Sequence, residues 1–160
     1  MKEYTESYCL AILITNLKHR NRYPGPITVA ECAKFLHEMY GSLEEVSRLV
    51  GVHPSVIRKW VSLANAPENL RQCVKEGKIY PVAAFAILSA FKDGSKIEEI
   101  TREVSGWGEP EIVHFIRFVK EHPHISVPEC KKRFVNEVIG RLVADSNNAT
   151  DDTDRRSFSS

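Results

Sequence analysis

The chain has 160 residues, of which 42% are hydrophobic and 27% charged, as expected for one packed domain with at most a small appendage. It has no apolar run of the roughly 18 residues that a membrane span needs, and it does not open with a secretion signal, so we expect a cytoplasmic protein without a membrane partner. The formal net charge is only +1, which by itself does not indicate a nucleic-acid partner.

Helical periodicity runs along the whole sequence, and strand-like alternation is nearly absent. A first helix is expected over about residues 4–20, because basic residues at its end suit the negative end of a helix dipole. Thr28 then occupies the place of an N-cap for a helix over 29–40. Glu31, three residues later, would complete a capping box, and Gly41 would end the helix.

Two shorter helices follow, with a turn between them. Ser42 and Glu45 form a capping-box pattern at the start of the first, and Gly51 supplies the left-handed backbone that a sharp turn needs. Pro54 suits the first position of the second helix, because the N–H that proline lacks is not needed there. Further helices are expected over residues 67–77, 80–91, 95–105, 109–122 and 127–144. The predicted fold class is therefore all-α, a multi-helix orthogonal bundle.

The two helices within residues 43–62 carry apolar residues spaced to face one another. These residues are Val46, Val50, Val52, Ile57 and Trp60. Ser47 is small, as a close helix crossing requires. The pattern is typical of a helix–turn–helix, in which the first helix crosses the DNA backbone and supports the second in the major groove.

The opposite side of the second helix carries polar and basic residues. Ser55, Arg58, Lys59 and Ser62 form one exposed stripe at helical spacing. Arginine suits bidentate contact with guanine, lysine contacts guanine or phosphate, and serine meets either a base edge or a phosphate. We predict that these four residues read bases, solvated surface charge being the alternative for Arg58. His53 is expected to contact a phosphate, with a plain helix cap as the alternative.

A resemblance to a known family extends over residues 42–91. The segments "EEVSRLVG", "SLANAPENL" and "VKEGKIYPVAAFAIL" resemble, in order and spacing, the central DNA-binding domain of the ParB family of partition proteins, which includes KorB-type regulators. Residues 16–36 look like the stretch that leads into that domain. The resemblance implies an all-helical domain that binds an operator or a centromere-like repeat, generally as a dimer, in plasmid or chromosome partition or in transcriptional control.

The resemblance does not extend to the larger N-terminal domain with which ParB proteins bind CTP, for which we expect no counterpart here. Thr15 stands where that family has the acidic residue of its ENxQR stretch. We therefore expect no nucleotide cofactor. Ala83 and Phe85 hold positions where many relatives carry a histidine and an arginine.

Additional basic and polar residues around the motif are candidate phosphate contacts: Ser42, Arg71, Lys75 and Lys78. A solvated, charged turn is the alternative for the last three. Residues 1–95 would form the DNA-binding domain and residues 96–144 a helical extension. Residues 145–160 contain almost no apolar side chains and are expected to be a disordered tail. The tail has a net charge of −2, which leaves +3 for residues 1–144.

Two apolar stripes mark the C-terminal third, and each is expected to pack on the domain's own core or to form a dimer interface. The first comprises Ile112, Phe115, Ile116 and Val119, and the second Val135, Val138, Ile139, Leu142 and Val143.

The expected function is sequence-specific binding of double-stranded DNA at a palindromic or repeated site, with the protein associated with the nucleoid or a plasmid. A homodimer and a partition ATPase are expected partners, and a helical protein-interaction adaptor is the alternative. An enzyme is not expected, since the sequence has no glycine-rich phosphate loop, clustered carboxylates or nucleophile–base pairing. No metal is expected either, because the cysteines lack the close pairing of zinc ligands. They are Cys9, Cys32, Cys73 and Cys130.

Overall fold

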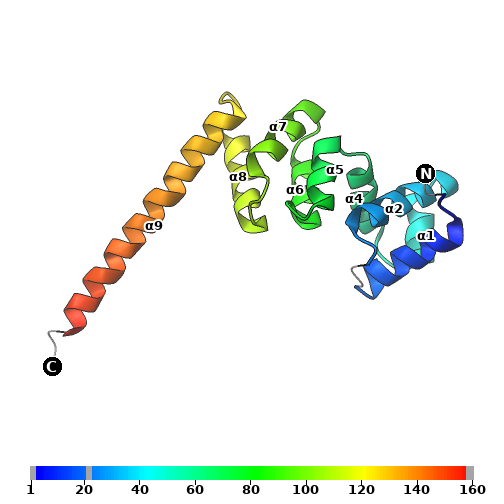
Figure 1. Cartoon of the computed structure of the whole chain (residues 1–160), viewed down its shortest axis with the longest axis horizontal. Helices are drawn as coiled ribbons and strands as arrows, with labels where there is room; N and C mark the ends of the chain where they lie inside the picture. The colour runs from blue at the N-terminus through cyan, green and yellow to red at the C-terminus, as the bar shows by residue number, and fades with distance from the viewer. Residues whose placement is uncertain (1–2, 21–22, 158–160) are drawn as a thin grey trace. The chain divides into compact units, whose positions relative to one another are not determined.

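A computed structural model describes residues 3–20 and 23–157, with side chains as far as residue 147 (Figure 1). Every regular element in these residues is a helix, which confirms the all-α class. The chain divides into two compact units, Met1–Val113 and His114–Ser160.

The first helix is shorter than expected and changes its geometry. α1 spans Glu6–Leu13 behind an N-cap at Thr5, and a π-helical segment, η1, continues over Ile14–Lys18. Thr15 Oγ donates to the carbonyl of Ala11 at 2.7 Å, and Asn16 Nδ2 donates to that of Ile12 at 2.8 Å. These side-chain donors compete for carbonyls that regular α-helical bonding uses, which fits the change of geometry at this point.

α2 spans Pro26–Tyr40, three residues longer at its start than expected. The predicted N-cap at Thr28 and its capping box are therefore wrong, because Thr28 lies inside the helix. Pro26 takes the first position instead, where its fixed φ suits a helix and no N–H is required. The carboxylate of Glu31 accepts a hydrogen bond from the Tyr4 hydroxyl. Gly41 ends α2 at a φ of 68°, as predicted.

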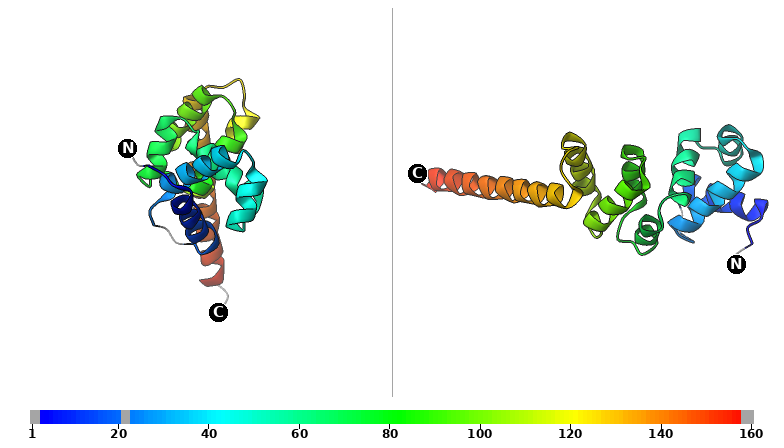
Figure 2. Two further views of the ribbon diagram at one scale, coloured as in Figure 1. Left: turned by 90° about the vertical axis from the view of Figure 1, so that its right-hand side faces the viewer. Right: turned by 90° about the horizontal axis from the view of Figure 1, so that it is seen from above.

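α3 spans Leu43–Val50 and α4 spans Pro54–Ala64, at the predicted positions. α4 packs mainly on α2 and α3, and Figure 2 shows α1 to α4 gathered together. Val46, Val50 and Ile57 are buried, which confirms their prediction as core residues. Val52 and Trp60 are half-buried against the same cluster. α1 and α2 contribute the other buried members, Cys9, Leu13, Val29, Cys32, Ala33 and Leu36.

Three more helices complete the first unit: α5 (Glu68–Lys75), α6 (Pro81–Ala90) and α7 (Gly94–Val104). Their buried residues include Leu70, Val74, Ile87, Ile100 and Val104. Ala83 is fully buried in α6. Phe85 meets Trp60 edge to face, with ring centroids 5.1 Å apart. These two positions therefore serve packing in this chain.

The second unit contains most of α8 (Glu109–Glu121) and all of α9 (Val127–Ser157). The Phe134 ring in α9 lies 5.5 Å from the ring of Phe115 and 5.8 Å from that of Phe118. The first apolar stripe of the C-terminal third is buried, as core packing requires. Val138, Ile139, Leu142 and Val143 of the second stripe are 39–62% exposed.

α9 continues to Ser157, across most of the segment for which low apolar content predicted disorder. Neither glycine nor proline occurs between Arg141 and Ser157, so nothing local interrupts the helix once it has started. Residues 158–160 of the predicted tail lie outside the described residues.

Candidate nucleic-acid interface

The connection between α3 and α4 is a tight turn over residues 51–53. Gly51 adopts a φ of 83°, and its N–H donates to the Ser47 carbonyl at 2.8 Å. The Val52 N–H donates to the same carbonyl at 3.2 Å, while the Ser47 hydroxyl donates to the Val52 carbonyl. The sequence predicted Ser47 only from its size, but its hydroxyl also closes the turn.

Replacing Gly51 with alanine should lower the free energy of unfolding by about 1–2 kcal/mol, because an L side chain is strained at this φ. The added Cβ would lie 3.4 Å from Lys18 Nζ, a tolerable contact, so the backbone term dominates. Urea unfolding measures the change. Gly94→Ala is the matched control, since Gly94 begins α7 without a positive φ and has open space around it. Equal stability of the two variants would contradict the assigned turn geometry.

The start of α4 is capped by His53. His53 Nδ1 accepts a hydrogen bond from the Ser55 N–H at 3.1 Å and lies 2.8 Å from Ser55 Oγ. A neutral His53 that accepts at Nδ1 carries its proton on Nε2. The helix-cap alternative is therefore observed, and it leaves an Nε2–H that can donate to a phosphate. The hydroxyl of half-buried Ser55 is engaged in this cap.

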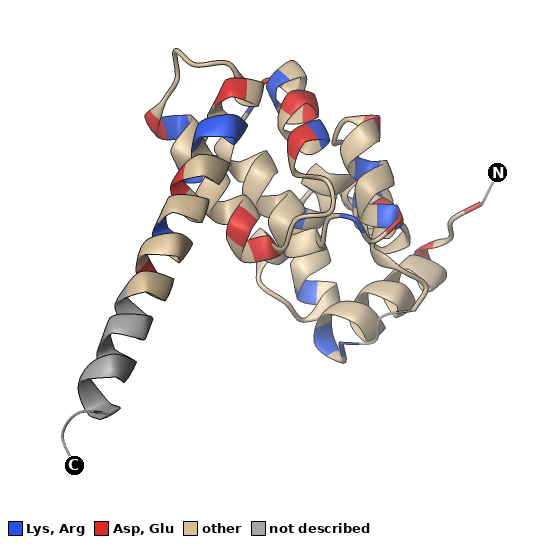
Figure 3. Cartoon of the chain, turned by 60° about the vertical axis from the view of Figure 1, so that its left-hand side comes forward, with Lys and Arg blue, Asp and Glu red and all other residues tan. Residues whose placement is uncertain are grey.

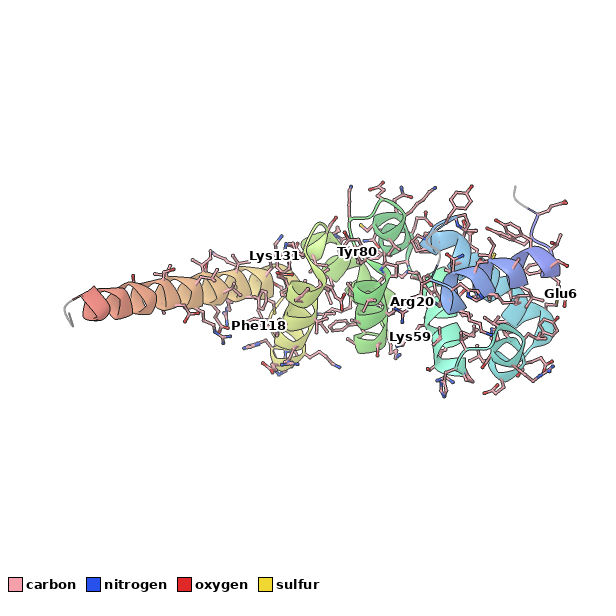
Figure 4. The ribbon with its side chains drawn as sticks, turned by 90° about the horizontal axis from the view of Figure 1, so that it is seen from below. Glu6, Arg20, Lys59, Tyr80, Phe118 and Lys131 are labelled. Atoms are coloured by element: carbon pink, nitrogen blue, oxygen red, sulfur yellow. The ribbon has the colours of Figure 1, made fainter. Side chains whose placement is uncertain are left out.

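The other three residues that were predicted to read bases are exposed to solvent. Arg58, Lys59 and Ser62 are exposed on α4, and none forms a hydrogen bond or ion pair with another described residue. We call these three residues the α4 ridge. Figure 4 labels Lys59, one of the three, on α4. Ile57 and Trp60 fix the other side of the same helix in the core, so the ridge is presented on a supported element.

Two predicted phosphate contacts already have structural partners. Ser42 Oγ caps α3 by accepting the Glu45 N–H at 3.2 Å, and it donates to Glu44 Oε2 at 3.2 Å. Arg71 Nε donates to the carbonyl of Ala66 at 3.1 Å, and its guanidinium pairs with Glu68. A phosphate would have to displace or share these bonds.

Of the two predicted phosphate-binding lysines, Lys78 has an acidic partner and Lys75 forms no close ion pair. Lys78 Nζ lies 2.8 Å from Glu76 Oε2, and this hydrogen bond raises the pKa of Lys78. Lys75 is exposed and makes no hydrogen bond or close ion pair within the described part of the chain. Among the basic residues of 71–78, Lys75 is therefore the one with no hydrogen bond or close ion pair to a described residue, although the Glu76 carboxylate is near enough to interact with its charge.

Lys18 is a candidate that sequence reasoning missed. Its Nζ lies against Gly51, 3.4 Å from the position of an ideal Cβ, although 33 positions separate the two residues along the sequence. The sequence signal was only a basic end on the first helix. Packing of that helix against the α3–α4 turn brings this positive charge to Gly51, which a linear pattern cannot show.

Charges of both signs are spread over the helices (Figure 3). On α3, Arg48 Nη2 lies 2.5 Å from Glu45 Oε1, and this hydrogen bond lowers the pKa of Glu45. Around the α3–α4 turn, Arg48 is thus held by an acidic partner, whereas Arg58, Lys59 and Lys18 form no hydrogen bond or ion pair with a described residue.

Comparisons of the chain with protein-family models, curated proteins and solved structures give no match. In the described residues, no helix is long and apolar enough to cross a bilayer, and no group of three or more histidine, cysteine or acidic residues could hold a metal ion.

Proposed function

We propose that the first unit binds double-stranded DNA sequence-specifically, with α3 and α4 acting as a helix–turn–helix of the ParB/KorB type. The single observation that supports this most is the exposed, unpaired α4 ridge on a helix whose other side is anchored by Ile57 and Trp60. The supporting turn at Gly51 and the sequence resemblance over residues 42–91 agree with it. Partition of a plasmid or chromosome, or control of transcription, is the proposed role.

In this proposal the ridge supplies base contacts and its surroundings supply phosphate contacts. Arg58 would donate to guanine, with Lys59 and Ser62 reading neighbouring positions. The His53 Nε2–H and Lys18 Nζ would meet phosphates beside the turn. Ser55 supports the cap more than it reads bases, because its hydroxyl is already engaged by His53.

Selection of bound duplexes from a random pool tests the proposal and identifies the preferred site. Arg58→Ala should then weaken binding to that site by about 1–3 kcal/mol and relax its sequence choice. Arg102→Ala removes the same charge from the exposed face of α7 and serves as the control. Fluorescence anisotropy with matched duplexes measures both variants. Equal losses would mean that Arg58 contributes net charge and no base contact.

Lys18→Ala should weaken binding to preferred and random duplexes alike, since a phosphate contact carries no sequence information. The slope of log K against log salt should fall in magnitude by about 0.9, the value for one neutralised phosphate. Titrations at several salt concentrations give this slope. A loss restricted to the preferred site would instead assign Lys18 to base reading.

We also propose a homodimer, because helix–turn–helix proteins commonly pair to read two half-sites. The exposed apolar residues of α9 are the surface that favours it. A partition ATPase is a further partner that the ParB resemblance suggests. The same apolar surface favours the second candidate function, a protein-interaction adaptor. Gel shifts against random DNA at two salt concentrations separate the two functions, since an adaptor alone shows no salt-dependent DNA binding.

A further inference from the structure

A solvent-open cavity of about 730 Å³ lies at the surface of the first unit, beside α4. Its walls come from η1, the start of α2, Trp60 of α4, the end of α5 and the segment leading into α6. This volume falls in the range of about 300–1,000 Å³ that is usual for small-molecule sites. No small-molecule site was predicted from the sequence at any of the residues that line it.

The walls combine flat apolar groups with aromatic rings. Pro26 and Pro81 supply aliphatic surface, and Val29 and Val74 also border the cavity but are only 2% exposed. Trp60 also borders the cavity, and apart from its contact with Phe85 it forms no ring contact or hydrogen bond in the described part of the chain. Tyr80 lines the same space and is 64% exposed, so its ring has area left to cover. A planar ring system would gain both apolar burial and aromatic contact here.

Among the described residues, the charged groups on the walls are all positive: Arg20 and Lys75 line the cavity, and no described aspartate or glutamate does. Neither cation has a hydrogen bond or close ion pair among the residues described. Glu31 lies in an adjoining cavity that Lys75 also borders, but its carboxylate accepts the Tyr4 hydroxyl. Figure 4 labels Arg20, which follows the end of η1 at Lys18, and Tyr80, which lies just before α6.

We propose that this cavity binds a small molecule that joins a flat aromatic ring system to an anionic group. Trp60 and Tyr80 contact the ring, while Arg20 and Lys75 hold the carboxylate or phosphate. Because Trp60 belongs to the same helix as Arg58 and Lys59, occupancy of the cavity biases the position of the α4 ridge. Only this regulatory consequence rests on the proposed DNA binding; the binding site itself does not.

Calorimetric titration of the full chain tests the site with two anionic probes, 2-naphthoate and adenosine 5′-monophosphate, and their neutral counterparts, 2-naphthalenemethanol and adenosine. At least one anion should bind with a Kd below about 1 mM, and its neutral counterpart at least about tenfold more weakly. Binding of naphthoate alone indicates an aryl acid as the natural ligand, and binding of the nucleotide indicates a nucleotide.

The double variant Arg20→Met/Lys75→Met should lose at least about tenfold in affinity for that anion. Lys92→Met/Arg102→Met removes the same two charges from exposed positions outside the cavity and should bind like the wild type. Circular dichroism verifies that both variants are folded. Absence of binding by both anions, equal binding of charged and neutral probes, or unchanged affinity in the first double variant would overturn the site.

The proposed effect of the ligand on DNA binding is tested by measuring the affinity for a labelled duplex by fluorescence anisotropy, with and without saturating probe. A change in DNA affinity of at least about threefold is expected, which corresponds to a modest coupling between two sites. Unchanged affinity would overturn the regulation. A protein that binds the probe but no DNA would refute the proposed function while leaving the cavity site intact.

Discussion

Ile57→Ala should lower the free energy of unfolding by about 2–5 kcal/mol. Ile57 is fully buried in the cluster formed by α1 to α4, so truncation removes apolar contacts and leaves a cavity. Relaxation can fill little of it, since Leu36 and Val46 of the same cluster are themselves fully buried. This effect is the largest that we expect from a single truncation in the α3–α4 pair.

Urea unfolding measured by circular dichroism provides the number, with Arg58→Ala as the control. Arg58 is the next residue on the same helix, but it is exposed and unpaired, so its truncation should change stability by less than about 0.5 kcal/mol. The two variants together distinguish residues that stabilise the fold from residues that contact DNA. Ile57→Ala should lower stability, and Arg58→Ala should weaken DNA binding alone. Comparable destabilisation by both would show that α4 is not anchored through Ile57.

Local signals explain why the α3–α4 pair could be predicted from the sequence. Ser42 caps, Gly51 turns and Pro54 begins a helix through interactions that span only a few residues. The spacing of Val46, Val50 and Ile57 then determines which faces meet. Each of these signals acts over one or two helical turns, so no knowledge of the rest of the fold was needed.

The errors arise where two local signals compete or where distant segments meet. Thr28 and Pro26 both signal a helix start, and the helix begins at Pro26, three residues before the predicted start at residue 29. Lys18 reaches the turn only through tertiary packing, and the cavity beside Trp60 combines residues from five segments. The prediction made α9 too short because it relied on the low apolar content of residues 145–160. Low apolar content shows that a segment cannot form a core, but it does not show whether residues that end a helix are present.

Fewer of the predicted DNA contacts have unengaged side chains in the structure than the sequence led us to expect. Ser42, Ser55 and Arg71 have the residue types of DNA contacts, but each is held by a capping bond or an ion pair. Periodicity identifies which side of a helix is polar, and it cannot show which polar groups are already satisfied. Arg58, Lys59 and Ser62, with Lys18 added, are therefore the residues on which the proposed function depends.

Leu142→Asp should weaken the proposed homodimer at least about 100-fold, because a carboxylate would have to lose its water at an apolar interface. Leu142 is 62% exposed in the single chain, next to Ile139 at 53% and Val143 at 56%. An apolar surface of this kind on a long helix is unusual unless a partner covers it. Sedimentation equilibrium over a range of protein concentrations measures the dissociation constant.

Ala144→Asp is the matched control for this prediction. Ala144 lies two residues after Leu142, on the other side of the helix from the apolar face, and it is exposed. The same added charge should therefore leave dimerisation nearly unchanged. If the wild type is monomeric at every concentration, or if both variants dissociate alike, the apolar face of α9 does not join two copies. A dimer lost only in Leu142→Asp, together with weaker binding to a palindromic site, would link α9 to the recognition of two half-sites.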